Sequence, residues 1–346
     1  MPRVAEAPPV AGLKAAWDAR LDDHVIAIAW SPDGSRLAAA SVSGPISLFS
    51  GIDGARVLDL PGHRHGTMAI SWSADGTLLA SGGQDGKARL WNGVTGEMVA
   101  EVDGGAQWVE CVAFSPVKQF LATAAGRKLR LWDATGNLLL EYPDHPSTIT
   151  DIQWQPNQLF FATAAYGRLS TFRCETPVPA KEFAWKGSIL RIAWSPDGNH
   201  VATGNQDATV HFWYRKSGKD LEMSGYPAKV RELAWDSGGR FLATGGSPVV
   251  TIWDCSGKGP AGSRPIELKG HYELISALAY QHKGPLLASG GRDGRVGIWN
   301  PSKSTRHVSG VELKSAVTQL AWSRDDTRLA AANEGGQVIV FLPEAK

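Results

Sequence analysis

Short segments in which apolar and polar residues alternate return along the whole chain, and each ends on a large aromatic residue. Segments such as VIAIAW, DIQW and ELAW have the period of two expected for a strand with one buried face. The terminal aromatic residues lie 40 to 45 residues apart, at Trp30, Trp72, Phe114, Trp154, Trp194, Trp235, Tyr280 and Trp322. A period this regular predicts a series of stacked or radially arranged structural repeats.

A polar turn and a second hairpin follow each aromatic residue. In the best-formed repeat, the small apolar run from Leu78 is followed by a Gln84-Asp85-Gly86 turn and by a strand that ends at Trp91. The sequence LASGGRDGRVGIWN, which begins at Leu287, repeats this pattern almost unchanged. Each repeat therefore predicts three short strands, with room for a fourth before the next repeat.

Two dipeptides mark the ends of the better repeats. Gly62-His63 and Gly270-His271 begin a repeat, and Trp132-Asp133 and Trp253-Asp254 end one. With these dipeptides, the chain resembles the WD40-repeat family from about Leu21 to Phe341. The resemblance implies an all-β fold, a β-propeller with four-stranded blades. We predict eight blades, with seven blades and one strayed repeat as the alternative.

The two ends of the chain are expected to meet in one blade. The last repeat ends near Phe341 with too few residues behind it for an outer strand, whereas Lys14 to Leu21 precedes the first complete repeat. We predict that this N-terminal segment supplies the missing strand and closes the ring, which removes open sheet edges. Residues 1–12 are interpreted as a disordered lead-in, and residues 13–346 as a single propeller domain.

The WD40 resemblance also implies a buried hydrogen-bonded set of His, Ser or Thr, Asp and Trp within a blade. Two repeats match all four positions and the fifth repeat matches three. The implied structural residues are His63, Ser81, Asp85 and Trp91; His271, Ser289, Asp293 and Trp299; and Thr203, Asp207 and Trp213. Such a set satisfies polar groups inside the blade and clamps the outer strand to the inner ones.

Composition narrows the class of protein. A net charge of +1 gives no reason to expect nucleic acid as a partner, and no run of apolar residues is long enough to span a membrane. Cys111, Cys174 and Cys255 show no spacing typical of disulfides or zinc sites, and no secretory signal is recognised, so we expect a cytoplasmic protein.

Candidate chemistry is sparse. The glycine-rich Ser81 to Gly86 segment is followed by a strand and not by the helix that a phosphate loop requires. Histidines that fall at equivalent ends of repeats could gather and bind zinc or copper: His24, His63, His65, His145 and His271. A metal-handling protein and a propeller enzyme with a site at the channel mouth are therefore kept as alternatives. We expect no catalytic residue, metal or cofactor.

The main hypothesis is a non-catalytic scaffold that binds a protein or peptide on one rim of the propeller. The turns between second and third strands and the connections into first strands should share this rim. Its bulky or charged residues, which we predict to bind the partner, are Arg64, Trp108, Arg127, Lys128, Tyr166, Arg168, Trp185, Lys186, Tyr226, Tyr272 and Arg292. The basic members favour a partner with acidic segments, and the protein by itself is expected to be a monomer.

Overall fold

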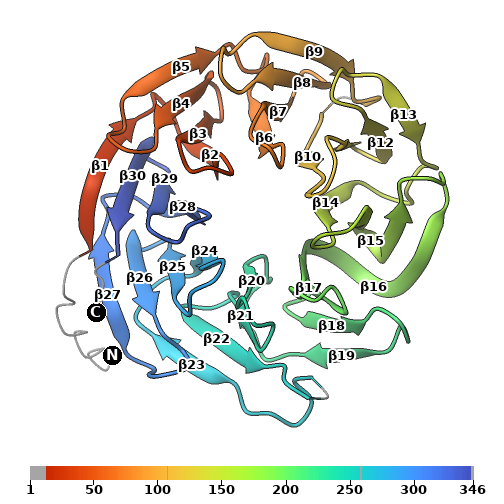
Figure 1. Ribbon diagram of the computed structural model, residues 1–346. Coiled ribbons are helices and arrows are strands. Elements are labelled where there is room, and N and C mark those ends of the chain that lie inside the picture. The colour runs from red at the N-terminus through yellow and green to blue at the C-terminus, as the bar shows by residue number, and fades with distance from the viewer. Residues whose placement is uncertain (1–12, 107, 258, 344–346) are drawn as a thin grey trace.

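The computed structural model describes residues 13–106, 108–257 and 259–343, and all of its regular elements are strands. The predicted lead-in, residues 1–12, lies outside the described residues. The strands form a closed ring of radial sheets around a central channel (Figure 1). Six sheets have four strands each, and a seventh has six strands.

We number the blades 1 to 8 along the chain and letter the strands of each blade a to d from the channel outwards. Blades 1 to 3 consist of β2 (Val25–Trp30), β3 (Arg36–Ser41), β4 (Ile46–Ser50) and β5 (Arg56–Leu60); β6 (Thr67–Trp72), β7 (Leu78–Gly83), β8 (Lys87–Asn92) and β9 (Met98–Asp103); and β10 (Cys111–Phe114), β11 (Leu121–Ala125), β12 (Lys128–Trp132) and β13 (Leu138–Glu141). Blades 6 and 7 consist of β20 (Leu233–Trp235), β21 (Phe241–Thr244), β22 (Val249–Asp254) and β23 (Ile266–Lys269); and β24 (Ile275–Tyr280), β25 (Leu287–Gly291), β26 (Arg295–Trp299) and β27 (His307–Glu312).

The six-stranded sheet contains blades 4 and 5. Its strands are β14 (Ile149–Trp154), β15 (Phe160–Arg173), β16 (Pro179–Trp194), β17 (His200–Asn205), β18 (Val210–Tyr214) and β19 (Asp220–Met223). The first half of β15 pairs with β14 and its second half with β16, and Gly167 between them has a φ of +89°. The second half of β16 pairs with β17. This strand therefore runs from the outer edge of blade 4 into the inner strand of blade 5, and the ring has eight blades, as predicted.

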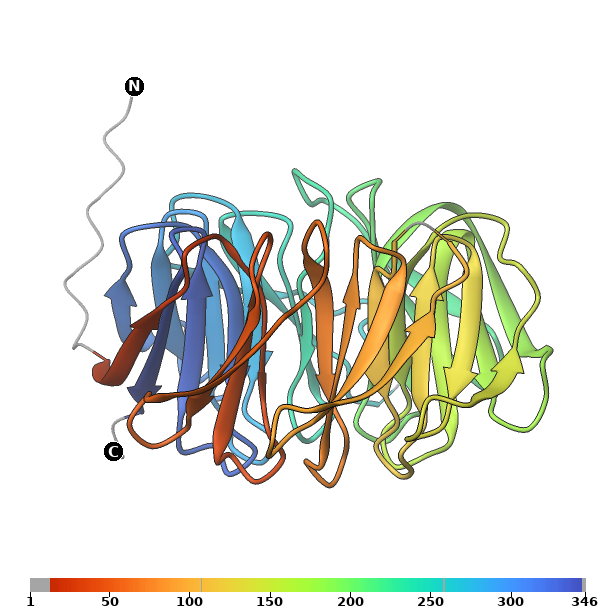
Figure 2. The same ribbon diagram turned by 90° about the horizontal axis from the view of Figure 1, so that it is seen from above.

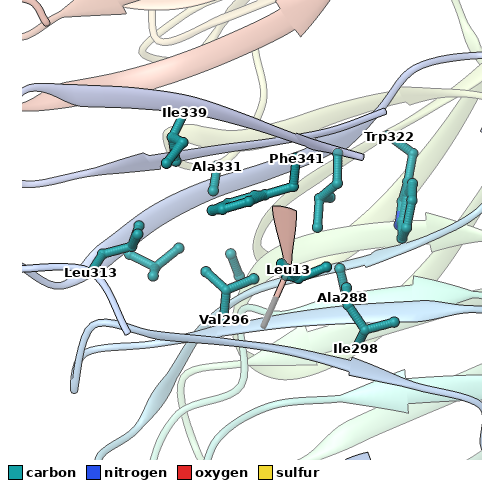
Figure 3. Close-up of a cluster of buried hydrophobic side chains, with 12 residues drawn as sticks. Leu13, Ala288, Val296, Ile298, Leu313, Trp322, Ala331, Ile339 and Phe341 are labelled. Atoms are coloured by element: carbon teal, nitrogen blue, oxygen red, sulfur yellow. The ribbon is translucent and has the colours of Figure 1, made fainter. Parts of the chain in front are cut away.

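Blade 8 joins the two ends of the chain. It consists of β28 (Val317–Trp322), β29 (Leu329–Asn333), β30 (Gln337–Leu342) and, as its outer strand, β1 (Lys14–Arg20). β1 pairs antiparallel with β30, and the backbone N–H of Leu21 donates to Gly336 O at 2.8 Å. Leu13 is buried with Val296, Ile298 and Phe341 between blades 7 and 8 (Figure 3). The prediction that the N-terminal segment closes the ring is confirmed.

The aromatic residues that end the inner strands join neighbouring blades. In six blades, the indole N–H of this residue donates to a backbone carbonyl of the preceding blade, at 2.9 to 3.2 Å. The pairs are Trp30 with Ala321, Trp72 with Ala29, Trp154 with Ala113, Trp194 with Gln153, Trp235 with Ala193 and Trp322 with Ala279. In each pair the acceptor is the residue just before the equivalent aromatic position. The sequence period thus marks a ring of contacts between blades.

The strand order assigns the connections to two faces of the ring (Figure 2). Because successive strands are antiparallel, the turns between strands a and b and the loops between strands c and d lie on one face, which we call the lower face. The turns between strands b and c and the connections from strand d to the next strand a lie on the other face, the upper face. The predicted rim residues belong to the upper face or to the strand ends next to it.

We expect Trp72→Phe to lower the free energy of unfolding by about 1–2 kcal/mol, because it keeps most of the ring but leaves Ala29 O without its donor. Urea unfolding followed by circular dichroism measures the change. Trp108→Phe is the matched control, since Trp108 is exposed and should tolerate the change. Equal stability of the two variants would contradict a role for the indole N–H.

Candidate partner-binding face

In blade 2, His63 links the connection from blade 1 to the hairpin of strands b and c. Its Nε2 lies 2.7 Å from Ser81 Oγ and its Nδ1 lies 2.9 Å from Asp85 Oδ1. Trp91 Nε1 donates to the same Ser81 oxygen at 2.9 Å. Burial lowers the pKa of His63, which favours a neutral ring that donates to Asp85 and accepts from Ser81. All polar groups of this set are thereby satisfied inside the blade.

Blade 7 has the same geometry. His271 Nε2 lies 2.8 Å from Ser289 Oγ, its Nδ1 lies 3.2 Å from Asp293 Oδ1, and Trp299 Nε1 donates to Ser289 at 2.7 Å. In blade 5 the set is reduced. Trp213 Nε1 donates to Thr203 Oγ1 at 3.3 Å, whereas Asp207 accepts from the Thr209 hydroxyl of its own turn.

Other blades fill the histidine position differently. In blade 4, His145 Nε2 lies 2.8 Å from Thr163 Oγ1. In blade 6 the position belongs to Tyr226, whose hydroxyl lies 2.8 Å from Thr244 Oγ1 and accepts from Trp253 Nε1 at 2.7 Å. The structure therefore places Tyr226 inside the blade and not at the partner surface expected from the sequence. The signal was its spacing of 18 residues from Thr244, which equals the spacing of His63 from Ser81.

These buried residues position their neighbours. The residue after the histidine is exposed in blades 2 and 7, as Arg64 and Tyr272 show, and Lys186 is exposed after the partly buried Trp185 of blade 5. The carboxylates of the turn also hold this backbone: Asp85 Oδ2 accepts the Arg64 N–H at 3.2 Å and Asp293 Oδ2 accepts the Tyr272 N–H at 2.7 Å. The blade hydrogen bonds thus present a row of side chains on the upper face.

The predicted partner-binding residues separate into exposed side chains and side chains engaged within the protein. Trp108 and Tyr166 are 49% and 55% exposed, and Tyr272 is 46% exposed beneath the Arg295 guanidinium, 4.0 Å from its ring centre. Arg64, Lys186 and Arg292 are exposed, and no ion pair involves them among the described residues.

The remaining basic and aromatic candidates have internal contacts. Lys128 Nζ lies 2.7 Å from Asp144 Oδ1, and Arg168 Nη1 lies 2.5 Å from Glu182 Oε1. Arg127 Nε donates to His145 O at 2.6 Å. Trp185 is partly buried, with its ring centre 3.8 Å from that of His211. These residues shape the face more than they extend from it.

The channel is an open cavity of about 1720 Å³ lined by the inner strands of all eight blades. Arg191 and Glu232, at equivalent positions of blades 5 and 6, line this cavity, and Asp151 at the equivalent position of blade 4 is buried. Asp151 Oδ2 accepts the Ile192 N–H at 2.8 Å, and Arg191 Nη1 lies 3.5 Å from Asp151 Oδ1. Asp151 and Arg191 thus connect the inner strands of blades 4 and 5.

The structure brings no metal-binding set together in the described residues. His63, His145 and His271 each bond within their own blade, so they do not gather at the rim as the metal alternative requires.

Burial raises the pKa of Cys174 to about 11 and that of Cys255 to about 12, so these thiols stay protonated and are poor nucleophiles at neutral pH. No helix in the described part of the chain could span a membrane.

Comparison with known families agrees with the geometry of the blades. The model of the WD domain, G-beta repeat, matches residues 18–44, 54–92, 96–133, 179–214, 220–254 and 262–300, more than half of the chain. The chain is a WD40-repeat protein. The matches leave out residues 134–178 and 301–346, which hold most of blades 4 and 8 and carry Phe172 and Phe341 where blade 2 has Trp91.

Relatives of this WD40 protein include components of several assemblies. It is 33% identical over 161 residues to "Cell division cycle 20.1, cofactor of APC complex" of Arabidopsis thaliana, covering 44% of this chain and 34% of the relative. It is 29% identical to "Telomerase protein component 1" of Mus musculus, covering 64% of this chain and 8% of the relative. With "THO complex subunit 3" of Arabidopsis thaliana the identity is 28%, over 39% of this chain and 42% of the relative. The chain thus spans well under two thirds of each relative.

A solved structure shows the same fold. The crystal structure of the computationally designed Ika8 protein superposes on this WD40 propeller with a TM-score of 0.82, covering 96% of this chain and 100% of the other. The sequence identity is 22%, so the likeness concerns the fold alone.

We expect Tyr226→Phe to lower the free energy of unfolding by about 1–2 kcal/mol, because the change removes the hydroxyl that bridges Thr244 and Trp253. Chemical unfolding of the purified variant measures this loss. Tyr166→Phe is the control, because Tyr166 is exposed. Unchanged stability of Tyr226→Phe would show that Tyr226 does not act inside the blade.

Acid should destabilise the propeller through His145. Burial lowers its pKa from 6.5 in the unfolded chain to about 4, so the folded protein holds His145 neutral while the unfolded chain takes up a proton. The stability present above pH 6.5 is therefore lost as the pH falls toward 4, by about 1–3 kcal/mol from this group. Urea unfolding at pH 7.5 and pH 4.5 should show a smaller loss for His145→Gln than for the native chain. Identical losses would contradict the assignment.

Proposed function

We propose that this WD40 propeller is a non-catalytic scaffold that binds a protein or peptide partner on its upper face. The main support is a pair of large aromatic side chains on that face. Trp108 of blade 3 and Tyr166 of the adjacent blade 4 are each about half exposed. Aromatic residues dominate binding hot spots because they bury a large area and keep a polar group for hydrogen bonding. Relatives named as components of complexes support a protein partner.

We further propose that the partner contributes acidic groups near the aromatic pair. Arg64 and Lys186, next to the pair in blades 2 and 5, supply exposed positive charges, whereas Lys128 and Arg168 already have carboxylate partners. Arg292 is also exposed, but it lies in blade 7 across the ring from blade 3. The acidic preference is therefore carried by fewer residues than the sequence predicts. A cytoplasmic location is part of the same proposal and is supported by the three cysteines, which are free.

A pull-down that compares the native chain with a Trp108→Ala, Tyr166→Ala variant tests this function. Both side chains are exposed, so the variant should fold normally and lose at least about tenfold in affinity for the partner. Mass spectrometry identifies the retained protein, and titration calorimetry with that protein measures the loss.

A matched control replaces Met98 and Leu138 with Ala. These residues are exposed to a similar extent but lie on the outer strands β9 and β13. The control should bind as the native chain does. If the same partner binds all three proteins equally, the upper face around blades 3 and 4 is not its binding site.

A further inference from the structure

The lower face of the ring divides into two halves of opposite charge. In blades 1 to 3 its turns and loops carry five acidic residues and a single basic one, Lys118. The acidic residues are Asp33, Asp53, Asp75, Glu97 and Asp133. Hydrogen bonds from Ser73 and Thr77 outweigh burial and lower the pKa of Asp75 to about 2, so it is ionised at neutral pH. This half of the face is negatively charged.

The opposite half, in blades 5 to 7, is positively charged. Six exposed basic side chains lie in its turns and loops, and none of them has a carboxylate partner among the described residues: Lys216, Lys219, Arg264, Lys283, Lys303 and Arg306. The same part of the face carries three acidic residues, Asp197, Asp236 and Asp254, of which Asp254 pairs with Arg240. Basic residues therefore outnumber acidic ones in this half.

Apolar side chains extend from the same face. Ile52 and Val94, at the tips of the c–d loops of blades 1 and 2, are 82% and 64% exposed, the highest values among the large hydrophobic residues of the described chain. Their backbone groups are hydrogen-bonded within the lower face, but their side chains extend into solvent. Apolar groups exposed on a charged face are typical of a contact surface.

We propose that two copies of this chain associate lower face to lower face, around a two-fold axis that passes through blades 4 and 8. Such an axis reverses the order of the blades, so blade 1 of one copy faces blade 7 of the other, blade 2 faces blade 6, and blade 3 faces blade 5. Each acidic blade then meets a basic one, and the contact is isologous, with each pair formed twice. A second copy satisfies both halves at once, which differs from the monomer expected from the sequence.

In this arrangement short acidic side chains of one copy lie opposite long basic side chains of the other. Asp53 of blade 1 would face Lys303 and Arg306 of blade 7, and Glu97 of blade 2 would face Arg264 of blade 6. The aliphatic stems of Lys and Arg can cover Ile52 and Val94 while their charged ends reach the carboxylates. Complementary charges steer association and fix the register of the two copies.

Charge reversal on the full-length chain tests the proposal. One variant carries Asp53→Lys and Glu97→Lys, and the other carries Arg264→Glu and Lys303→Glu. In a dimer of either variant alone, like charges face each other in both symmetry-related halves of the contact. Sedimentation velocity in about 50 mM salt should therefore show dissociation to monomers. An equimolar mixture should restore the dimer, because the reversed acidic half of one variant meets the reversed basic half of the other and the second contact is native.

The control reverses charge on the upper face with Arg64→Glu and Lys186→Glu, and it should remain dimeric. Melting temperatures show that every variant is folded. A native chain that stays monomeric at about 100 μM in low salt, or a dimer that neither reversal weakens, would overturn the proposal. Partner binding on the upper face is measured separately, so failure here leaves the proposed scaffold function unaffected.

Discussion

The hydrogen bond from an inner-strand indole to the carbonyl of the preceding blade is the constraint on which the ring depends. Apolar packing between blades is not directional, and it would tolerate a range of rotations of one sheet against the next. The indole N–H must point at one carbonyl, so each of these six contacts fixes the angle and height of its blade relative to its neighbour. Each bond contributes only about 1 kcal/mol net, but it defines the repeat geometry. The bond from Trp30 to Ala321 applies the same geometry across the point of closure, between residues 291 positions apart.

Two of the eight contacts between neighbouring blades lack this hydrogen bond, and the two contacts differ in structure. Phe114 has no N–H on its ring, but its backbone N–H donates to Ser71 Oγ of the preceding blade at 3.0 Å, which ties blades 2 and 3 by another route. Tyr280 is buried between blades 6 and 7, and its hydroxyl has no partner among the described residues. The inner strand on the other side of this contact, β20, has only three residues. Blades 6 and 7 are instead joined by apolar packing and by the backbone hydrogen bond from Ile275 N–H to Ser247 O at 3.0 Å.

The repeat period could be predicted from the sequence because the alternating strand, the polar turn and the terminal aromatic residue recur together, in the same order and at the same spacing. The closing strand followed from counting, since the last repeat lacked a strand and the N-terminal segment was available. The internal hydrogen bonds of Tyr226 were not predicted because its residue type was considered without its spacing: a tyrosine can bond the blade serine or threonine through its hydroxyl as histidine does through Nε2. The engagement of Arg168 and Lys128 could not be predicted, because it depends on which carboxylate the outer strand places opposite them.

The blade hydrogen bonds also explain how a structural pattern yields a recognition surface. In blades 2 and 7 a buried histidine fixes the backbone of the connection, and the following residue is exposed. In blades 2 and 7 the turn carboxylate bonds both the histidine and the next backbone N–H, so Arg64 and Tyr272 are held by the same groups that satisfy the core. Their side chains are free to vary because the backbone, and not the side chain, carries the constraint. A propeller can thus change what it binds without changing what holds it together, which is why the upper face differs from blade to blade while the buried set remains recognisable.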